Sequence, residues 1–168
     1  MTEQSSMTTS RPGSGYGTRA IGTPGRSSVY VSFDVEHDRE LYERLLVQSG
    51  GAGFIVSGRS ELLGTTFAGV QIRPLIRDAD QLIVICGEHT ELSACMATEL
   101  RIAQEEGRPY FLLWGRRGSM CKKPVGARSA DGMYSWTREI LQDQVSCGLR
   151  RSRALAASER TRGSARES

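Results

Sequence analysis

A glutamate in the middle of an apolar helix face is the residue in this sequence best placed to do chemistry. Glu99 lies in a stretch with amphipathic periodicity, in which residues about 100° apart gather on one side of a helix. Its neighbours on that side are apolar, namely Leu92, Cys95, Met96, Leu100, Ile102 and Ala103. A carboxylate at such a position must be hydrogen-bonded or ion-paired, be exposed at a sheet edge, or take part in binding or catalysis. Both a structural Glu, bonded to a backbone N–H or an Arg, and a functional carboxylate fit this pattern.

The elements around this glutamate place it near the carboxyl end of a strand. Residues 81–87 contain a short apolar run rich in β-branched side chains, which is typical of a strand covered on both faces. The turn at 87–90 ends the run, and either Thr90 or Ser93 caps the helix that follows. A second apolar run at 109–114 follows the helix. Because open α/β sheets bind ligands at the carboxyl ends of their strands, the carboxylate is expected beside a binding edge.

The same alternation of apolar and amphipathic stretches runs through the middle of the chain. It predicts further strands at 29–33 and 53–57 and further helices at about 39–48, 67–77 and 133–145. Residues 115–133 are either a long loop or a degraded strand–helix unit. The pattern favours a three-layer αβα domain with a parallel sheet of about five strands, in the flavodoxin-like order 2-1-3-4-5.

In that strand order the switch point, where ligands bind, lies between the first and third strands. At this point the end of the first strand should lie beside the turn after the third strand, with Glu99 close to both. The residues expected to meet are Ser32, Phe33 and Asp34 on one side and Gly87, Glu88 and His89 on the other. Phe33 could stack on a ligand ring. His89 fits equally well as a hydrogen-bond donor in the pocket and as a surface residue.

The two ends of the chain are expected to be disordered tails around a domain at 28–147. Residues 1–27 are rich in Ser, Thr and Gly, and their glycines have no preceding strand that would make a phosphate loop. Residues 148–168 carry six Arg against two Glu, a net charge of +4, while the whole chain carries only +3. This Arg-rich end lacks the aromatic residues or readout motif of a nucleic-acid binder, which argues against that partner.

Composition indicates one globular, cytoplasmic domain. A chain of 168 residues is long enough for a proper core, and it contains no apolar membrane-spanning segment or signal-peptide core. The four cysteines include no C-x-x-C pair, so neither a zinc nor a redox motif is present. Reduced thiols are therefore expected, without a metal or a bound cofactor.

Two stretches resemble TIR domains. Residues 93–100, Ser-Ala-Cys-Met-Ala-Thr-Glu-Leu, are similar to the Ser-x-Trp-Cys-x-x-Glu-Leu helix of that family, with Cys95 at the Trp position. The preceding Ile-Val-Ile-Cys-Gly-Glu-His-Thr resembles the TIR-like branch found in Thoeris antiphage systems. Residues 29–33, followed by Asp38, resemble the first strand of the family. The resemblance covers roughly residues 28–145.

The resemblance implies an enzyme that cleaves the nicotinamide–ribose bond of NAD, so that NAD is a substrate. Glu99 would bind the ribose hydroxyls and oppose the positive charge that develops at the anomeric carbon, while Cys95 would line the pocket. In Thoeris-type relatives the product is a cyclic ADP-ribose derivative that activates a downstream effector protein. TIR-like relatives also self-associate, here expected through the loop at 57–66.

Two alternatives stay open. A non-catalytic TIR interaction module would show no NAD turnover, even after enforced oligomerisation. A nucleoside deoxyribosyltransferase also uses a Glu at such a site to break an N-glycosidic bond. Two other classes with this fold are excluded. A response regulator needs a phosphorylatable Asp where this strand ends in Cys86-Gly87, and a flavodoxin needs a phosphate loop where this chain has the acidic turn at 34–38.

Overall fold

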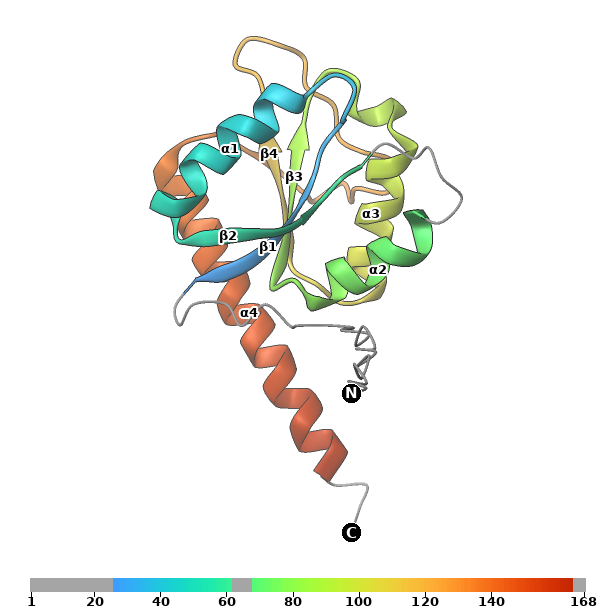
Figure 1. Cartoon of the computed structure of the whole chain (residues 1–168), viewed down its shortest axis with the longest axis vertical. Helices are drawn as coiled ribbons and strands as arrows, with labels where there is room; N and C mark the ends of the chain where they lie inside the picture. Colours follow the sequence, from blue (N-terminus) through green and yellow to red (C-terminus); the bar gives the residue numbers. More distant parts are fainter. Residues whose placement is uncertain (1–25, 62–67, 165–168) are drawn as a thin grey trace, which may run out of the picture.

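The computed structural model describes residues 26–61 and 68–164, whose strands form a single parallel sheet (Figure 1). The elements in chain order are β1 (Ser27–Ser32), α1 (Arg39–Ala52), β2 (Phe54–Arg59), α2 (Ala68–Asp78), β3 (Gln81–Cys86), η1 (Thr90–Leu92), α3 (Ala94–Glu105), β4 (Tyr110–Trp114), β5 (Met133–Tyr134) and α4 (Arg138–Ser164). The strand order is β2-β1-β3-β4-β5, and every neighbouring pair is parallel. The three-layer, flavodoxin-like α/β fold expected from the sequence is thereby confirmed.

Side chains on the strands alternate between two apolar layers. Helices α1 and α4 cover one face of the sheet, and α2 and α3 cover the other (Figure 1). Val31 and Ile83 belong to the first layer, whereas Leu82 and Leu112 belong to the second. Every residue of β3 is buried, as the continuous apolar run predicts for a central strand between β1 and β4.

The helix that carries Glu99 begins later than its apolar arc suggests. Ser93 is the N-cap of α3, and its hydroxyl accepts a hydrogen bond from the backbone N–H of Met96 at 3.4 Å. Thr90, the other candidate cap, belongs to η1 and accepts instead from the backbone N–H of Gly87. Leu92 precedes the helix and is 77% exposed, so it does not belong to the buried arc.

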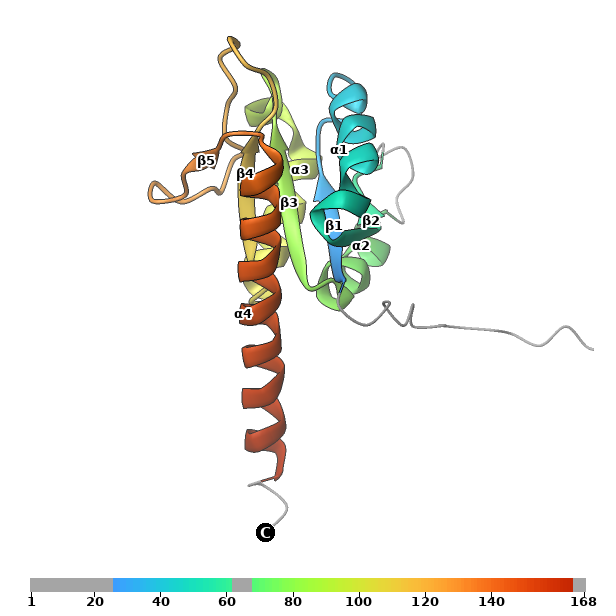
Figure 2. The ribbon, with the colours of Figure 1, turned by 90° about the vertical axis from the view of Figure 1, so that its left-hand side faces the viewer.

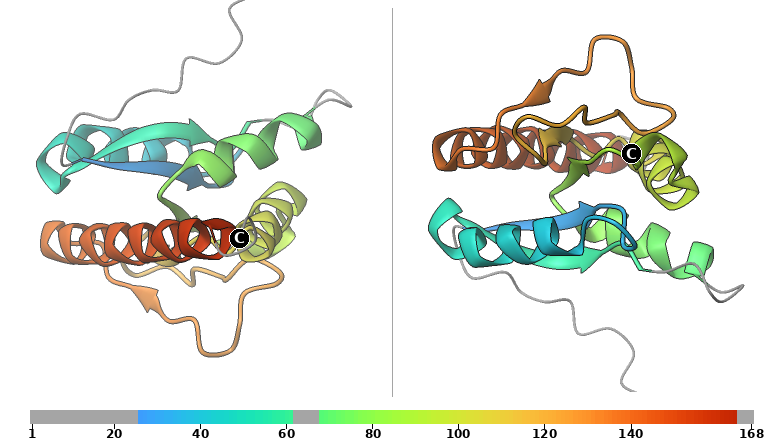
Figure 3. Two further views of the ribbon diagram at one scale, coloured as in Figure 1. Left: turned by 90° about the horizontal axis from the view of Figure 1, so that it is seen from below. Right: turned by 90° about the horizontal axis from the view of Figure 1, so that it is seen from above.

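Two expected segments differ from the structure near the edges of the sheet. Strand β2 extends to Arg59, so residues 57–59 of the expected association loop are strand, while residues 62–67 lie outside the described ranges. Residues 115–132 form a long connection, and the last helix begins at Arg138 rather than at Met133, which instead opens the two-residue strand β5. Figure 3 shows this connection projecting at the end of the sheet far from β2.

Helix α4 continues through Ser164, so the prediction of a disordered end is wrong for residues 148–164. Gly148 and Ser152 are buried against the domain, and the Gln81 side chain donates to the Val145 carbonyl at 3.2 Å. A Cβ on Gly148 would lie 1.8 Å from Oε1 of Gln81, so glycine permits this close contact. The following turns are exposed and project beyond the sheet (Figure 2), and they are rich in strong helix formers such as Ala, Leu, Arg and Glu.

Removing the exposed end of α4 should therefore leave the domain stable, whereas removing the turns that pack on the sheet should destabilise it. A chain that stops after Ala156 loses only residues beyond the packed turns, so its thermal midpoint should stay nearly unchanged. A chain that stops after Gln144 loses Val145, Gly148 and Ser152, and the burial of one Val alone contributes about 1.5–3 kcal/mol. Thermal melts followed by circular dichroism measure both effects. Equal midpoints for the two truncated chains would contradict the packing of α4 on β3.

Candidate functional site

The carboxyl group of Glu99 is enclosed by four side-chain donors. Its side chain on α3 is 0% exposed. The Tyr30 hydroxyl donates to Oε1 at 2.8 Å, and the Cys95 thiol donates to the same oxygen at 3.4 Å. The hydroxyls of Ser32 and Ser60 donate to Oε2 at 2.5 and 2.6 Å. These five residues are called the Glu99 cluster below.

Three separate elements bring the donors to the glutamate. Tyr30 and Ser32 are two positions apart on β1, so both side chains leave the same face of the sheet, toward α3. The Tyr30 ring passes over Gly58 of β2, where a Cβ would lie 2.7 Å from Cδ2 of the ring. Ser60 directly follows β2, and Cys95 lies one helical turn before the glutamate on α3. The cluster therefore joins β1, the end of β2 and α3.

Burial shapes the protonation of this cluster. Desolvation raises the pKa of Glu99, and the hydrogen bonds from Ser32, Ser60 and Tyr30 oppose this shift without cancelling it. Burial and the neighbouring Glu99 raise the pKa of Cys95 to about 12, and they raise that of Tyr30 further, so both groups keep a proton to donate. Within residues 26–61 and 68–164, no Lys, Arg or His forms an ion pair with Glu99.

The hydrogen bonds of the cluster accommodate both protonation states of Glu99. The single hydroxyl proton of Tyr30 has two acceptors in reach, Oε1 of Glu99 at 2.8 Å and the Arg59 carbonyl at 2.9 Å. When Glu99 is ionised, Tyr30 donates to the carboxylate. When Glu99 is protonated, it can donate to the Tyr30 oxygen while Tyr30 donates to Arg59. The site can thus gain or lose a proton without losing its contacts.

The structure separates the two neighbouring residues Ser32 and Phe33. Ser32 belongs to the Glu99 cluster, but Phe33 points to the opposite face of β1, because successive side chains on a strand alternate. Phe33 is 1% exposed and stacks on Tyr42 of α1 with ring centroids 4.7 Å apart. The prediction that Phe33 could stack on a ligand ring is therefore wrong, since the ring is part of the core.

The expected meeting of the loops after β1 and β3 is present, and it runs through His37. Oδ1 of Asp34 accepts from the backbone N–H groups of Glu36 and His37 at 3.0 and 3.2 Å. Its Oδ2 lies 3.2 Å from Nδ1 of His37. The His37 ring in turn lies against the ring of His89, with centroids 4.2 Å apart. Glu88 is exposed beside them.

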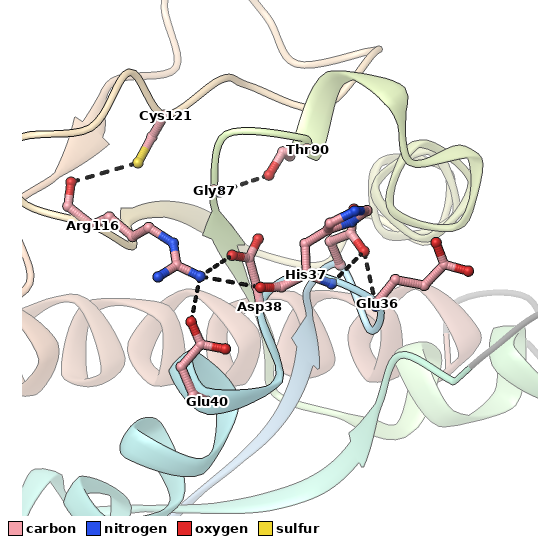
Figure 4. Close-up of polar contacts among 9 residues, drawn as sticks. Glu36, His37, Asp38, Glu40, Gly87, Thr90, Arg116 and Cys121 are labelled. Atoms are coloured by element: carbon pink, nitrogen blue, oxygen red, sulfur yellow. Dashed lines mark hydrogen bonds and ion pairs between the residues drawn. The ribbon is translucent and has the colours of Figure 1, made fainter.

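A second group of charges lies at the carboxyl ends of β3 and β4 (Figure 4). The buried carboxylate of Asp38 pairs with the guanidinium of Arg116 at 3.1 Å, and Arg116 also contacts Glu40. Burial raises the pKa of Asp38, against the opposing effect of Arg116. Oδ2 of Asp38 has no hydrogen-bond partner in the part of the chain described, and a Cβ on Gly87 would lie 2.0 Å from it. We call Asp38, Glu40, Gly87 and Arg116 the carboxyl-edge cluster.

Gly87→Ala tests this close contact. The added methyl group would displace the Asp38 carboxylate, so we expect a loss of about 1–3 kcal/mol in unfolding free energy, as for other overpacked sites. Gly132→Ala is the matched control, because a Cβ there would have no heavy atom within 4 Å. Urea unfolding measures both. An equal change in the two variants would contradict the packing of Asp38 on Gly87.

The two clusters differ in what they can do. In the carboxyl-edge cluster a cation already neutralises the buried acid, which suits a structural role. In the Glu99 cluster all the donors found within residues 26–61 and 68–164 are neutral, so none of these residues competes with a cationic ligand or a developing positive charge for the carboxyl group. Tyr30 and Ser60 were not identified from the sequence. The spacing of Tyr30 from Ser32 was a usable signal, but no local pattern marks Ser60.

Comparisons with known proteins identify no relative from which the role of the site could be inferred. No protein-family model matches the chain, and no curated protein matches it either. In the described ranges, no helix has the length and apolarity needed to cross a membrane. The same residues include no group of three His, Cys, Asp or Glu side chains arranged to hold a metal ion.

Proposed function

We propose that this chain is a TIR-like enzyme that cleaves the bond between nicotinamide and ribose in NAD, with Glu99 as the charge-stabilising group. The observation that carries the proposal is a buried carboxyl group with hydroxyl and thiol partners and no cation paired to it among the described residues. The resemblance of residues 93–100 to the TIR glutamate helix supports the choice of substrate.

The reaction requires a group that opposes positive charge at the sugar. When the bond from the anomeric carbon to the nicotinamide nitrogen breaks, its electron pair neutralises the pyridinium and leaves an oxocarbenium-like ribose. An ionised Glu99 beside that carbon would stabilise this charge. Attack by water, with loss of one proton to solvent, gives ADP-ribose. Attack by an adenine nitrogen gives a cyclic product instead.

The donors around Glu99 are chemically similar to those that a ribose offers. Ribose hydroxyls could replace Ser32 and Ser60 as donors to the carboxylate. A bound cation would also lower the raised pKa of Glu99 and so favour its charged form. The carboxyl group would thus gain charge when the reacting group arrives, which is the differential interaction that catalysis needs. Cys95 is the one member of the cluster with appreciable exposure, so approach to Glu99 is expected beside it.

The direct test is incubation of the full chain with NAD, followed by mass spectrometry of the products. Nicotinamide should appear together with an equal amount of ADP-ribose or a cyclic isomer. TIR-like proteins act as assemblies. The same assay on a chain fused to an oligomerising domain therefore tests whether self-association activates the enzyme. If neither form releases nicotinamide at any protein concentration, the proposal fails.

A non-catalytic interaction module is the second candidate, and one observation favours it. Both carboxyl oxygens of Glu99 already have two donors each, which also suits a residue that only fastens α3 to β1 and β2. A module of this kind would bind a copy of itself or an effector protein without consuming NAD. A deoxynucleoside offered with a free base in the same assay identifies the third candidate, a deoxyribosyltransferase.

A further inference from the structure

A cavity of about 610 Å³ opens at the end of the sheet opposite to the carboxyl ends of the strands. Its walls come from the end of α3, the turn into β4, the connection before β5, and α4. The volume falls within the range of about 300–1,000 Å³ that small-molecule sites occupy. The Glu99 cluster contributes no residue to these walls, so this cavity is independent of the proposed NAD site.

Three arginines and a single acidic residue are among the residues that line the cavity. The arginines are Arg108, Arg128 and Arg151, and none of them forms an ion pair within the described ranges. The carboxylate, Asp131, is already engaged, because its Oδ2 accepts from the Tyr110 hydroxyl at 2.7 Å and from the Arg128 backbone N–H at 2.9 Å. Three arginines against one aspartate give these wall residues a formal net charge of +2, and no carboxylate of the described ranges pairs with the arginines.

Arg108 has an unused donor in this cavity wall. Its Nε atom is buried and has no hydrogen-bond partner in the described part of the chain. Its Nη1 atom makes a long contact of 3.5 Å with the Ser152 hydroxyl of α4. Because Nε is covered by protein atoms, a ligand in the cavity would reach the outer part of the guanidinium group instead. Guanidinium groups bind phosphate oxygens with two parallel hydrogen bonds, which makes phosphate a suitable acceptor.

Apart from Gln104, the remaining wall residues are mostly apolar or aromatic, and they indicate what else the ligand contains. Pro109, Ala154 and Leu155 line the cavity, and Leu155 is 45% exposed although it is a large apolar residue. Tyr110 adds an aromatic ring. We propose that this cavity binds a small organic phosphate, with the phosphate at Arg108, Arg128 and Arg151 and an apolar or aromatic body against Leu155.

Isothermal titration calorimetry on the full chain tests this site with two probes, phenyl phosphate and inorganic phosphate. Both should bind, phenyl phosphate more tightly because its ring contacts the apolar wall. Arg108→Met and Arg151→Met should each weaken both probes by roughly tenfold or more, because each removes hydrogen bonds to a charged group. Leu155→Ser should weaken phenyl phosphate alone.

Arg153→Met is the matched control, because Arg153 is exposed on the same helix and does not line the cavity. It should leave both affinities unchanged. Arg151 is an exposed residue, so Arg151→Met keeps the test decisive if Arg108→Met does not fold. No saturable binding of either probe, or an equal loss of affinity in Arg153→Met and Arg151→Met, would overturn the proposal.

Discussion

Glu99→Gln should remove NAD cleavage and leave the domain folded. The substitution takes away the negative charge that would stabilise the oxocarbenium-like state, and loss of a main electrostatic stabiliser costs on the order of 10²-fold or more in rate. The amide matches the geometry of the protonated acid. Its oxygen can accept from Ser32 and Ser60, and its NH₂ group can donate to Tyr30, which then donates to the Arg59 carbonyl.

The difference in stability between the parent and this variant should depend on pH in a defined direction. Burial raises the pKa of Glu99 above its ordinary value of 4.5, so the folded protein binds this proton more tightly than the unfolded chain does. The stabilisation is therefore fully present below pH 4.5 and is lost as the pH rises through the folded-state pKa. Glutamine does not titrate. Urea unfolding should show that the unfolding free energy of the variant increases relative to that of the parent as the pH rises above 4.5.

Glu43→Gln is the control for this experiment, since Glu43 is exposed on α1 and lies outside both clusters. It should keep the parent rate. If Glu99→Gln unfolds the domain, Glu99 is a structural bond between α3 and the sheet, as in an interaction module. If the variant folds and turns over NAD at the rate of an active parent, another group performs the chemistry.

Arg116→Met should destabilise the domain by about 2–3 kcal/mol at neutral pH. It leaves the Asp38 carboxylate buried without its cation, and breaking a fully buried pair costs about 3–5 kcal/mol. The Arg116 side chain is 35% exposed, so water can replace part of the lost interaction and the loss should be smaller. Chemical unfolding measures this loss. Arg77→Met is the control, because the Arg77–Asp78 pair is exposed and should contribute little.

The loss in Arg116→Met should shrink at acidic pH. Arg116 lowers the pKa of Asp38, while burial raises it, so removal of Arg116 leaves a still higher pKa. Attraction between the two groups exists only while Asp38 is ionised, and it disappears as Asp38 takes up a proton. The difference in unfolding free energy between parent and variant should therefore be larger at pH 7 than near pH 4. A difference that is constant with pH would contradict the ion pair.

The sequence by itself determined strands β1 to β4, helices α1 to α3 and their order, because hydrophobic periodicity is a local property. The continuous apolar run in β3 required cover on both faces, and the structure buries every residue of that strand. The helical periodicity of α3 placed Glu99 on the buried side, where it is 0% exposed. Alternation of strand and helix then restricted the sheet to a parallel arrangement.

Only the tertiary structure decided which groups surround that glutamate and where the last helix ends. Tyr30, Ser32 and Ser60 reach Glu99 across 69, 67 and 39 residues of chain, and no local period encodes such contacts. The packing of the first half of α4 likewise depends on the contact of Gly148 with Gln81 of β3. This contact could not be predicted from a segment whose composition is typical of a polar tail. Local side-chain patterns specify which face of an element is buried, whereas packing between distant elements specifies what it is buried against.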